Sequence, residues 1–496
     1  MLENILHSLV LILQWESVAA MVLGTIIGMV MGALPGVSGT LAIALAIPFT
    51  YEMAPLTALG LLAGIHNGTS QGGAIPAVLL RIPGTPGAIC TTWDGYPLAQ
   101  QGHAGAAIQL SAISSAVGGM IGALALVLLA PPLASVALAF GPAEIFWVNV
   151  FGLTAIAAML GDDILKGIIS ACFGLLLGTI GLDETTGTER FTFDIIELIN
   201  GLPMLVVMVG LFSFPPSWEM AQGSVGGAID TFKMIMTKGV WKIRQVWRAW
   251  VKSSIIGIII GILPGSSISG FIAYAEVKRT AREPEKFGKG SVEGLACAEC
   301  VNNADNAASM IPALTLGVPG GTIAALMLGA LMIQGFQPGP QLFKNNPEIV
   351  YGYSWQMFIT SLLLIPLGGV VASRLFAHLL RLPAVLLLPM IVVMTVAGSF
   401  AAQNSMWDVY LAFGFGLVGL GMDRLGLPIA PVIIGLVLGA KAEFSLRVAL
   451  LLTQGDPLPL FTRPICLVLI GLTLLMLLYP LIRRVIALRR ARAAAA

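Results

Sequence analysis

Hydroxyl side chains follow two Leu-Pro-Gly sequences that interrupt apolar stretches of the chain, "GMVMGALPGVSGTLAIALAI" (28–47) and "GIIIGILPGSSISGFIAYAE" (257–276). A Pro-Gly pair breaks a helix, and the helix that restarts after it has free backbone N–H groups and a positive dipole end. Such a helix start, edged with hydroxyls, can bind an anion without a charged side chain. The alternative interpretation is that glycine and proline only permit close packing and a kink.

Two shorter breaks occur at Ile-Pro-Gly (82–84) and Val-Pro-Gly (318–320). The sequence therefore predicts four helix starts, two in each half of the chain, which together suit a ligand with several carboxylates. The candidate substrate-binding residues are Gly36, Ser38, Gly39, Thr40, Gly84, Thr85, Gly265, Ser266, Ser267, Ser269, Gly320 and Thr322.

A second polar segment, "AECVNNADNAAS" (298–309), has its acid and amide side chains at helical spacing. The spacing predicts that these side chains share one helical face. Polar residues at membrane depth are costly and indicate function, and amide oxygens are plausible Na⁺ ligands, while Glu299 can carry charge or a proton. With the corresponding segment "GIHNGTSQGG" (64–73), the candidate coupling-ion residues are Asn67, Thr69, Ser70, Glu299, Asn302, Asn303 and Asn306. The alternative is a hydrogen-bonded seam between helices.

Three further features have two interpretations each. Asp94-Gly95 indicates a turn, expected on the cytoplasmic side, that is either a gate or a loop cap. Arg81, the sole Lys or Arg of the first 165 residues, either anchors the topology or binds a substrate carboxylate. The "CAEC" sequence (297–300) has redox or zinc spacing, but its apolar surroundings favour packing. We expect no cofactor and no structural metal, only Na⁺ or H⁺ as coupling ion.

The elements that must position these residues are membrane helices. The chain has 496 residues, of which 57% are hydrophobic and 10% charged, and its mean hydropathy is +0.91. Soluble domains carry about 25% charged residues. Apolar runs near 20 residues recur along the whole length and are long enough to cross a bilayer. This composition predicts an all-α polytopic membrane protein, and the net charge of +1 excludes an electrostatic match to nucleic acid.

Clusters of Lys and Arg lie at 233–252, at 278–289 and after Tyr479, and the positive-inside rule places them in the cytoplasm. The acidic segment 181–197 fits the outer face. Because the segment 253–277 has basic clusters at both ends, we expect it to enter the membrane, turn near Pro264 and return, with arms of about 17 Å. The first copy has acidic flanks, and we expect it to turn near Pro35 and to open to the opposite side.

The two halves of the chain match in order. The Leu-Pro-Gly blocks align at an offset of 229 residues, and "AIPAVLLRIPGT" (74–85) aligns with "MIPALTLGVPGG" (310–321) at an offset of 236. Duplication with about five crossings per unit predicts two inverted repeats, about eleven crossings in all and two re-entrant hairpins, as in secondary transporters. The predicted parts are an N-terminal segment (1–17), transmembrane repeat 1 (18–232), a basic cytoplasmic linker (233–252), transmembrane repeat 2 (253–482) and a basic cytoplasmic tail (483–496).

Four ordered motifs carry a resemblance to a known family: "GALPGVSGT", "IPGTPGAICTTWDGYPLAQQG", "AECVNNADNAASMIPALTLGVPGG" and "GALMIQGFQPGPQLF". With them the chain resembles the large membrane subunit of the tripartite tricarboxylate transporters. The resemblance implies cation-coupled uptake of a tricarboxylate or dicarboxylate across a bacterial inner membrane. It also implies two partners, a periplasmic solute-binding protein and a small four-helix membrane subunit. The sequence departs from the family pattern at Cys297-Ala298 and at Pro86-Gly87.

Other classes of function fit the sequence less well. A channel-like anion permease without a binding-protein partner is the alternative, but a channel needs a continuous polar path, and polarity here is concentrated near a few breaks. An intramembrane enzyme would need a Ser/His or Asp/Asp pair, for which His66 near Ser70 is the sole candidate, so we do not expect an enzyme. The chain lacks the nucleotide-binding loop of a primary pump.

Overall fold

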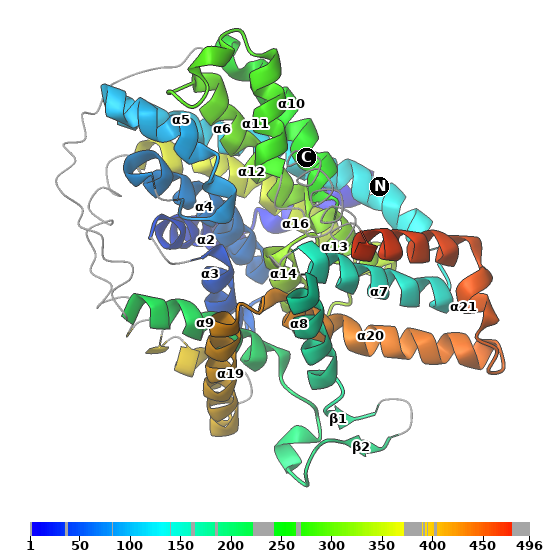
Figure 1. Cartoon of the computed structure of the whole chain (residues 1–496). Helices are drawn as coiled ribbons and strands as arrows, with labels where there is room; N and C mark the ends of the chain where they lie inside the picture. The colour runs from blue at the N-terminus through cyan, green and yellow to red at the C-terminus, as the bar shows by residue number, and fades with distance from the viewer. Residues whose placement is uncertain are drawn as a thin grey trace, which may run out of the picture.

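The computed structural model describes residues 2–34, 38–81, 83–138, 140–159, 164–183, 187–221, 243–263, 269–371, 389, 392–393, 395–400 and 404–478 (Figure 1). Helices make up most of this part of the chain. The two short strands in it, β1 (Gly181–Leu182) and β2 (Glu189–Arg190), pair antiparallel in a small hairpin. The predicted all-α class therefore agrees with the described residues.

The helices of the N-terminal half are α1 (Leu2–Ile12), α2 (Trp15–Ala33), α3 (Gly39–Ala46), α4 (Pro55–Leu80), α5 (Thr91–Leu98), α6 (Ala104–Ala137), α7 (Pro142–Met159), α8 (Ile164–Leu177) and α9 (Met204–Ala221). Those of the C-terminal half are α10 (Ile243–Gly261), α11 (Ser269–Thr280), α12 (Val292–Ala308), α13 (Met310–Leu316), α14 (Thr322–Ile333), α15 (Pro340–Asn345), α16 (Pro347–Leu364), α19 (Met406–Leu425), α20 (Ala430–Leu452) and α21 (Leu458–Thr462). A further apolar helix covers Pro464–Leu478.

The first Leu-Pro-Gly region folds as a long helix, a short returning helix and a second long helix. Helices α2 and α4 run parallel, because successive glycines of α2 lie on successive backbone carbonyls of α4. The pairs in contact are Gly24 with Leu61, Gly28 with Ile65, and Gly32 with Thr69. A side chain at these glycines would collide with the α4 backbone, so the Gly-x-x-x-Gly spacing permits this close approach.

The second Leu-Pro-Gly region repeats this arrangement with α10, α11 and α12. Gly257 lies on Val301 and Gly261 on Asp305, at the same offsets that align the two sequence blocks. At the open end of this hairpin, opposite its turn, Lys252 Nζ donates a hydrogen bond of 2.6 Å to Thr280 Oγ1. The two ends of the segment 253–277 therefore meet, as the hairpin prediction requires.

Two details of the hairpins differ from the prediction. Helix α10 is 19 residues long, whereas we expected arms of about 17 Å, or about 11–12 residues, for the segment 253–277; α11, with 12 residues, has the expected length. Helix α10 begins at Ile243, so the basic stretch expected as a linker is helical over its last ten residues. The expected turn residues Pro35 and Pro264 lie outside the described residues, as do the first ten residues of the linker and the tail 483–496.

The loops after α4 and α13 also match between the halves. Helix α4 ends at a left-handed residue, Arg81 (φ 61°), and α13 ends at Gly317 (φ 72°), 236 positions later. Beyond these turns, Gly84 N donates to Gly73 O at 3.1 Å, and the equivalent Gly320 N donates to Ser309 O at 3.3 Å. Both loops thus fold back onto the helix that precedes them in the same way.

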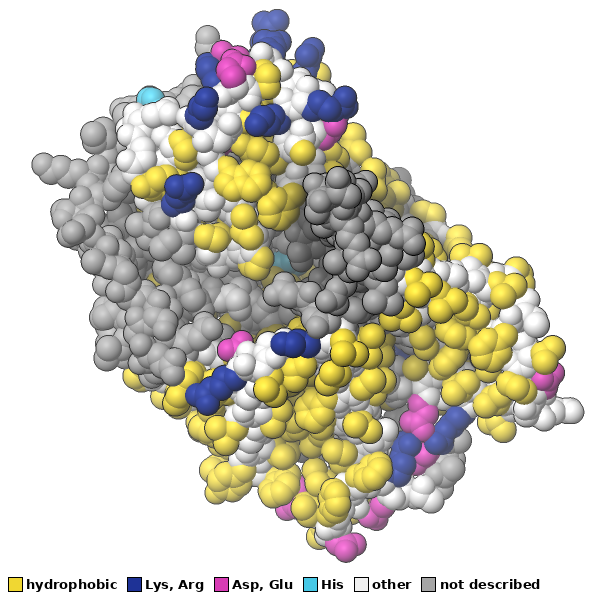
Figure 2. All heavy atoms as spheres, in the orientation of Figure 1, with side chains coloured by type: hydrophobic (Ala, Val, Ile, Leu, Met, Phe, Trp, Pro, Cys, Tyr) yellow, Lys and Arg dark blue, Asp and Glu magenta, His cyan; other side chains and the backbone are white. Residues whose placement is uncertain are grey.

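Three helical stretches in the described part of the chain are long and apolar enough to cross a membrane: Trp15–Ala33, Thr91–Ala137 and Pro347–Gly369. The predicted total of about eleven crossings stays a prediction. Figure 2 shows hydrophobic side chains over much of the visible face, while Lys and Arg gather at the end formed by α10 and α11. Bulky apolar side chains such as Ile255 and Ile259 of α10 are more than half exposed, as expected of a lipid-facing surface.

The β1–β2 hairpin is fastened to α20 by ion pairs. Arg190 Nη1 lies 2.9 Å from Glu443 Oε1, and Arg447 Nη1 lies 2.9 Å from Asp183 Oδ1. The hydrogen bond to Glu443 raises the pKa of Arg190, so this guanidinium stays charged. These contacts hold the acidic segment 181–197 at the end of the molecule away from the basic α10–α11 end (Figure 1).

Candidate functional site

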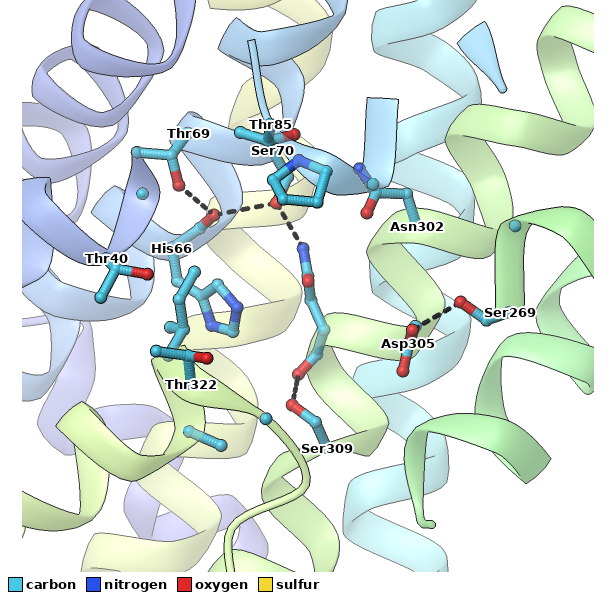
Figure 3. Close-up of a pocket in the computed structure, with 18 of the residues that line it drawn as sticks. Thr40, His66, Thr69, Ser70, Thr85, Ser269, Asn302, Asp305, Ser309 and Thr322 are labelled. Carbon is cyan, nitrogen blue, oxygen red and sulfur yellow. Dashed lines mark hydrogen bonds between the residues drawn. The ribbon is translucent and has the colours of Figure 1, made fainter. Parts of the chain in front are cut away.

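A polar cavity of about 250 Å³ lies between α4 and α12, where segments from both halves of the chain meet. The first turns of α3, α11 and α14 and the loop after α4 complete its wall (Figure 3). Its polar lining residues are Ser38, Thr40, His66, Thr69, Ser70, Thr85, Cys90, Ser269, Asn302, Asp305, Asn306, Ser309 and Thr322. Most of them are predicted site residues, so the fold brings together side chains far apart in the sequence.

Helix α4 contributes one stripe of this lining. Thr69 Oγ1 and Ser70 Oγ both donate to the backbone oxygen of His66, at 3.0 and 3.3 Å. Figure 3 shows the His66 ring between Thr40 and Thr322 on one side and Asp305 on the other. Because Ser70 donates to a backbone carbonyl, the described contacts do not form a Ser–His nucleophile pair.

Helix α12 contributes the facing stripe, formed by Asn302, Asp305, Asn306 and Ser309 at i, i+3, i+4 and i+7. Asn306 Nδ2 donates to Ser70 Oγ at 2.5 Å. These two residues are equivalent at the 236-residue offset, so corresponding positions of the two halves meet in the cavity. Asp305 Oδ2 accepts a hydrogen bond of 2.6 Å from Ser269 Oγ at the start of α11.

Of the four predicted α12 residues, Glu299, Asn302, Asn303 and Asn306, only two reach the cavity. Asn302 and Asn306 line the cavity, but Glu299 and Asn303 are fully buried on another side of α12. Glu299 accepts hydrogen bonds from Thr91 and from Ser115 Oγ, the latter at 2.9 Å. Asn303 Nδ2 donates to the Glu299 backbone oxygen at 3.2 Å.

Asn67 is separated from the cavity in the same way. Its Nδ2 donates to Thr360 Oγ1 at 2.8 Å and to Ser361 Oγ at 3.0 Å on α16. The amide oxygens of Asn67 and Asn303 are both buried without a hydrogen-bond partner among the described residues. The seven predicted coupling-ion residues therefore divide into a cavity group (Thr69, Ser70, Asn302, Asn306) and a buried group (Asn67, Glu299, Asn303).

The four predicted helix starts are only partly present. Ser38 caps α3 by accepting from Leu41 N at 3.1 Å, and α14 begins at Thr322 with no side-chain cap. After Gly84 the chain forms only a 3₁₀ turn (Pro86–Ala88), and α5 begins at Thr91, so the expected helix start is absent there. The candidate residues Gly36, Gly265, Ser266 and Ser267 lie outside the described residues.

The glycines among the predicted site residues shape the wall of the cavity. Gly39 and Gly320 line it directly. Gly84 does not line it but lies against the Gly32 carbonyl and against Gly73. A side chain at Gly84 would push the loop that carries Thr85 away from the α2–α4 pair.

Three polar atoms of the lining have no hydrogen-bond partner among the described residues: His66 Nδ1, Thr85 Oγ1 and Asn302 Nδ2. Each can donate a hydrogen bond, His66 in the appropriate tautomer. Unsatisfied buried donors are costly and mark places where a ligand or water completes the bonding. The lining residues that the structure describes include no Lys or Arg, so donors of this kind and helix starts are the groups that they offer to an anion.

Asp94 binds a loop. Its Oδ1 accepts from the backbone N–H groups of Gly288, Gly290 and Ser291 at 2.7–3.0 Å, and its Oδ2 accepts from Tyr274 Oη at 2.7 Å. The neighbouring Gly95 is buried, and a side chain there would meet Val78. Asp94 therefore anchors the charged loop between α11 and α12, while a gating role stays a prediction.

We expect Asp94→Ala to release this loop, because three backbone donors and one hydroxyl lose their acceptor, each worth about 1.5–3 kcal/mol. Trypsin cleavage after Lys286 and Lys289, followed by mass spectrometry, should accelerate by at least about tenfold. Glu276→Gln, which removes an exposed carboxylate of α11 whose side chain pairs with Arg279, is the control. Equal cleavage rates in wild type and Asp94→Ala would show that Asp94 does not hold the loop.

Sequence reasoning missed Asp305, Ser309 and Cys90 as lining residues. Asp305 is the equivalent of Thr69 at the 236-residue offset, and Ser309 is the equivalent of Gly73. The offset could have indicated the position of Asp305, because Thr69 is a predicted site residue, but it gives no such signal for Ser309 or Cys90. His66 is the equivalent of Asn302 at the same offset and is not among the predicted site residues.

The remaining predicted features lie away from the cavity. Arg81 is exposed, and its guanidinium lies 6.0 Å from the ring centre of Tyr96, so it does not reach the lining. Cys297 and Cys300 are buried and free, in agreement with packing. No group of three or more His, Cys, Asp or Glu side chains that could hold a metal ion occurs among the residues whose positions are described.

A helical fold with an apolar surface and a polar cavity between broken helices is the architecture of a membrane protein. The chain belongs to the tripartite tricarboxylate transporter TctA family, whose model matches residues 18–434. This is a family of transporters and not of enzymes.

Two relatives come from Agrobacterium vitis. An uncharacterized 52.8 kDa protein of the TAR-I ttuC′ 3′ region is 36% identical over 446 residues, which is 89% of this chain and 88% of the relative. An uncharacterized protein of the TAR-II ttuC′ 3′ region is 35% identical over 228 residues, 46% of this chain and 94% of the relative. No solved structure matches the chain.

Proposed function

We propose that this chain is the membrane subunit that moves a carboxylate across the bacterial inner membrane, with the cavity between α4 and α12 as its substrate site. The observation that carries the proposal is the cavity itself, whose described lining has hydroxyl, amide and imidazole groups, one carboxylate and no Lys or Arg. A carboxylate that leaves water needs donors to replace its hydration shell. The free N–H groups at the start of α14 and the unpartnered donors supply them.

The proposed mechanism rests on two inverted repeats. Both halves contain a parallel pair of long helices joined by a short returning helix, a left-handed turn at equivalent positions, and the same loop hydrogen bond. The basic ends of the second hairpin and the acidic flanks of the first support opposite orientations. The repeats meet at the Ser70–Asn306 hydrogen bond, so relative movement of the two repeats would open the cavity to one side at a time.

The proposal extends to the coupling ion and the partners. We infer coupling to Na⁺ or H⁺, with the cavity group and the buried group of polar residues as candidate sites. The family name denotes a tripartite system, and this supports a periplasmic solute-binding protein and a small four-helix membrane subunit as partners. The cytoplasmic side would carry the α10–α11 end and the C-terminus.

Transport assays in proteoliposomes test the proposal. The chain is reconstituted with the small membrane subunit and its binding protein, and accumulation of radiolabelled citrate and succinate is followed with and without an imposed Na⁺ or pH gradient. We expect at least one of the two anions to accumulate above equilibrium, and only with a gradient and with the binding protein. Equilibration without accumulation and without the binding protein would instead indicate a channel-like permease. Failure of both anions to enter would contradict carboxylate transport.

A further inference from the structure

The electrostatics of the cavity are asymmetric between the two halves of the chain. Among the described residues that line it, Asp305 is the one acidic side chain, and none is Lys or Arg. Among the ion pairs between described residues, none includes Asp305. A site for a carboxylate therefore contains a carboxylate of its own with no basic side chain to balance it.

The position of Asp305 explains why an uncompensated negative charge there needs a cation. Its Oδ1 lies beside Gly261, the last residue of α10. A Cβ atom at Gly261 would lie only 2.6 Å from this oxygen. The C-terminal end of a helix carries the negative end of its dipole and favours cations. The contact that does stabilise the carboxylate is the 2.6 Å hydrogen bond from Ser269 Oγ. Two oxygen-bearing side chains thus converge at a helix end, as Na⁺ ligands do.

The first half of the chain has no acid at the equivalent place. Thr69 occupies the position of Asp305, and its hydroxyl donates to the His66 backbone oxygen at 3.0 Å. The unpartnered donors of the cavity include His66 Nδ1, which belongs to a side chain only 1% exposed, and Thr85 Oγ1. Both come from the first half, and Figure 3 shows them away from Asp305. The third unpartnered donor, Asn302 Nδ2, lies on α12 one turn before Asp305, so two of the three unpartnered donors lie on the side of the cavity away from Asp305.

A substrate carboxylate in this cavity cannot lie far from Asp305. Two negative charges about 8 Å apart repel enough to lower affinity roughly thirtyfold at an effective dielectric constant of 20. A substrate with two carboxylates loses more affinity, because both are repelled by Asp305. Neutralisation of Asp305 removes this penalty, so a cation at Asp305 and a carboxylate beside the first-half donors bind with positive cooperativity, which is reciprocal.

We propose that Asp305, with Ser269, holds the coupling cation inside the substrate cavity, while His66 and Thr85 face the substrate carboxylates. The cation is a single Na⁺ or a proton on the carboxylate. This assignment rests on the proposed transport function and departs from a symmetric site in which both halves bind carboxylates. The other titratable side chains among the described lining residues are His66 and Cys90. Between Lys252 and Glu276 the one titratable side chain is Tyr274 of α11, whose hydroxyl donates to Asp94 Oδ2.

Binding measurements on the full chain in nanodiscs test the assignment. Citrate and succinate are titrated with Na⁺ present or replaced by choline, at acidic and at alkaline pH. In the wild type we expect the cation, Na⁺ or H⁺, to raise affinity by about thirtyfold. Asp305→Asn should bind at the wild type's cation-saturated affinity under every condition. Asp423→Asn, an exposed acid of α19, should keep the wild-type dependence.

Ser269→Ala is the second variant, because it keeps the carboxylate. In this variant the cation should still raise the affinity for citrate or succinate, but a higher cation concentration should be needed to reach the same increase. The assignment is overturned if Asp305→Asn retains the full cation dependence, if Glu299→Gln alone removes it, or if wild-type affinity does not depend on a cation. Absence of any citrate or succinate binding by the wild type would instead count against the proposed function.

Discussion

Gly28→Ala is expected to destabilise the folded protein severely. The Cβ atom of the new side chain would stand 2.5 Å from the backbone oxygen of Ile65 and 2.8 Å from its Cα. Backbone atoms cannot rotate away as a side-chain terminus can, so α2 and α4 must move apart. Overpacking of this kind costs about 1–3 kcal/mol and sometimes more. The readout is the apparent melting temperature and the monodisperse fraction of purified protein in detergent.

A graded series makes this prediction specific. In the second half, Gly257→Ala would place its Cβ 2.9 Å from the Val301 oxygen, so a smaller loss is expected. At Gly414 of α19 a Cβ would meet nothing within 4 Å, and Ala there should be neutral or slightly stabilising through its helix propensity. If Gly28→Ala and Gly414→Ala had the same melting temperature, the close approach of α2 and α4 would be refuted.

The difference between the two helix pairs has a basis in the sequence of their second helices. Helix α4 carries Gly64, Gly68 and Gly72, and each of these lies against the backbone of α2. At the 236-residue offset α12 carries Cys300, Ala304 and Ala308. The glycines of α2 could be predicted as packing residues from their spacing. Their partner helix could not, because a Gly-x-x-x-Gly sequence does not identify the surface it packs against.

The division of the α12 polar residues shows where sequence reasoning reached its limit. At 100° per residue, Asn302, Asp305, Asn306 and Ser309 centre about 90° away from Glu299 and Asn303 on the helix surface. Periodicity therefore predicted that the segment is helical and polar. Periodicity could not predict that α12 has two separate polar surfaces. Which residues belong to each surface depends on what packs against it, here the cavity on one side and α6 on the other.

The repeat offset was more informative than periodicity. It pairs Ser70 with Asn306, which hydrogen bond, and Gly84 with Gly320, which form the same loop contact. It did not indicate Asp305 as a charged site, because its partner Thr69 is a hydroxyl residue. Asp305 makes the two halves of the cavity differ, and for that reason the repeat alignment could not predict its charge.

Thr85→Val is expected to weaken carboxylate binding by about tenfold to a hundredfold. The Thr85 hydroxyl lines the cavity and has no partner among the described residues. It is held in place by the loop contact, since a Cβ at Gly73 would lie only 2.8 Å from Thr85 Oγ1. Valine has nearly the same shape, so the wall is kept and one hydrogen bond to a charged group is lost, worth about 1.5–3 kcal/mol.

The control is the same substitution at Thr92, seven residues later, whose hydroxyl donates to the Ile89 backbone oxygen at 2.7 Å and does not line the cavity. Both variants are titrated with citrate and succinate under cation-saturated conditions, after equal melting temperatures have been verified. Thr92→Val should bind as the wild type does. Because the proposed carboxylate side belongs to the first half of the chain, the loss in Thr85→Val should persist at every cation concentration. Wild-type affinity in Thr85→Val would show that the carboxylate does not bind on this side of the cavity.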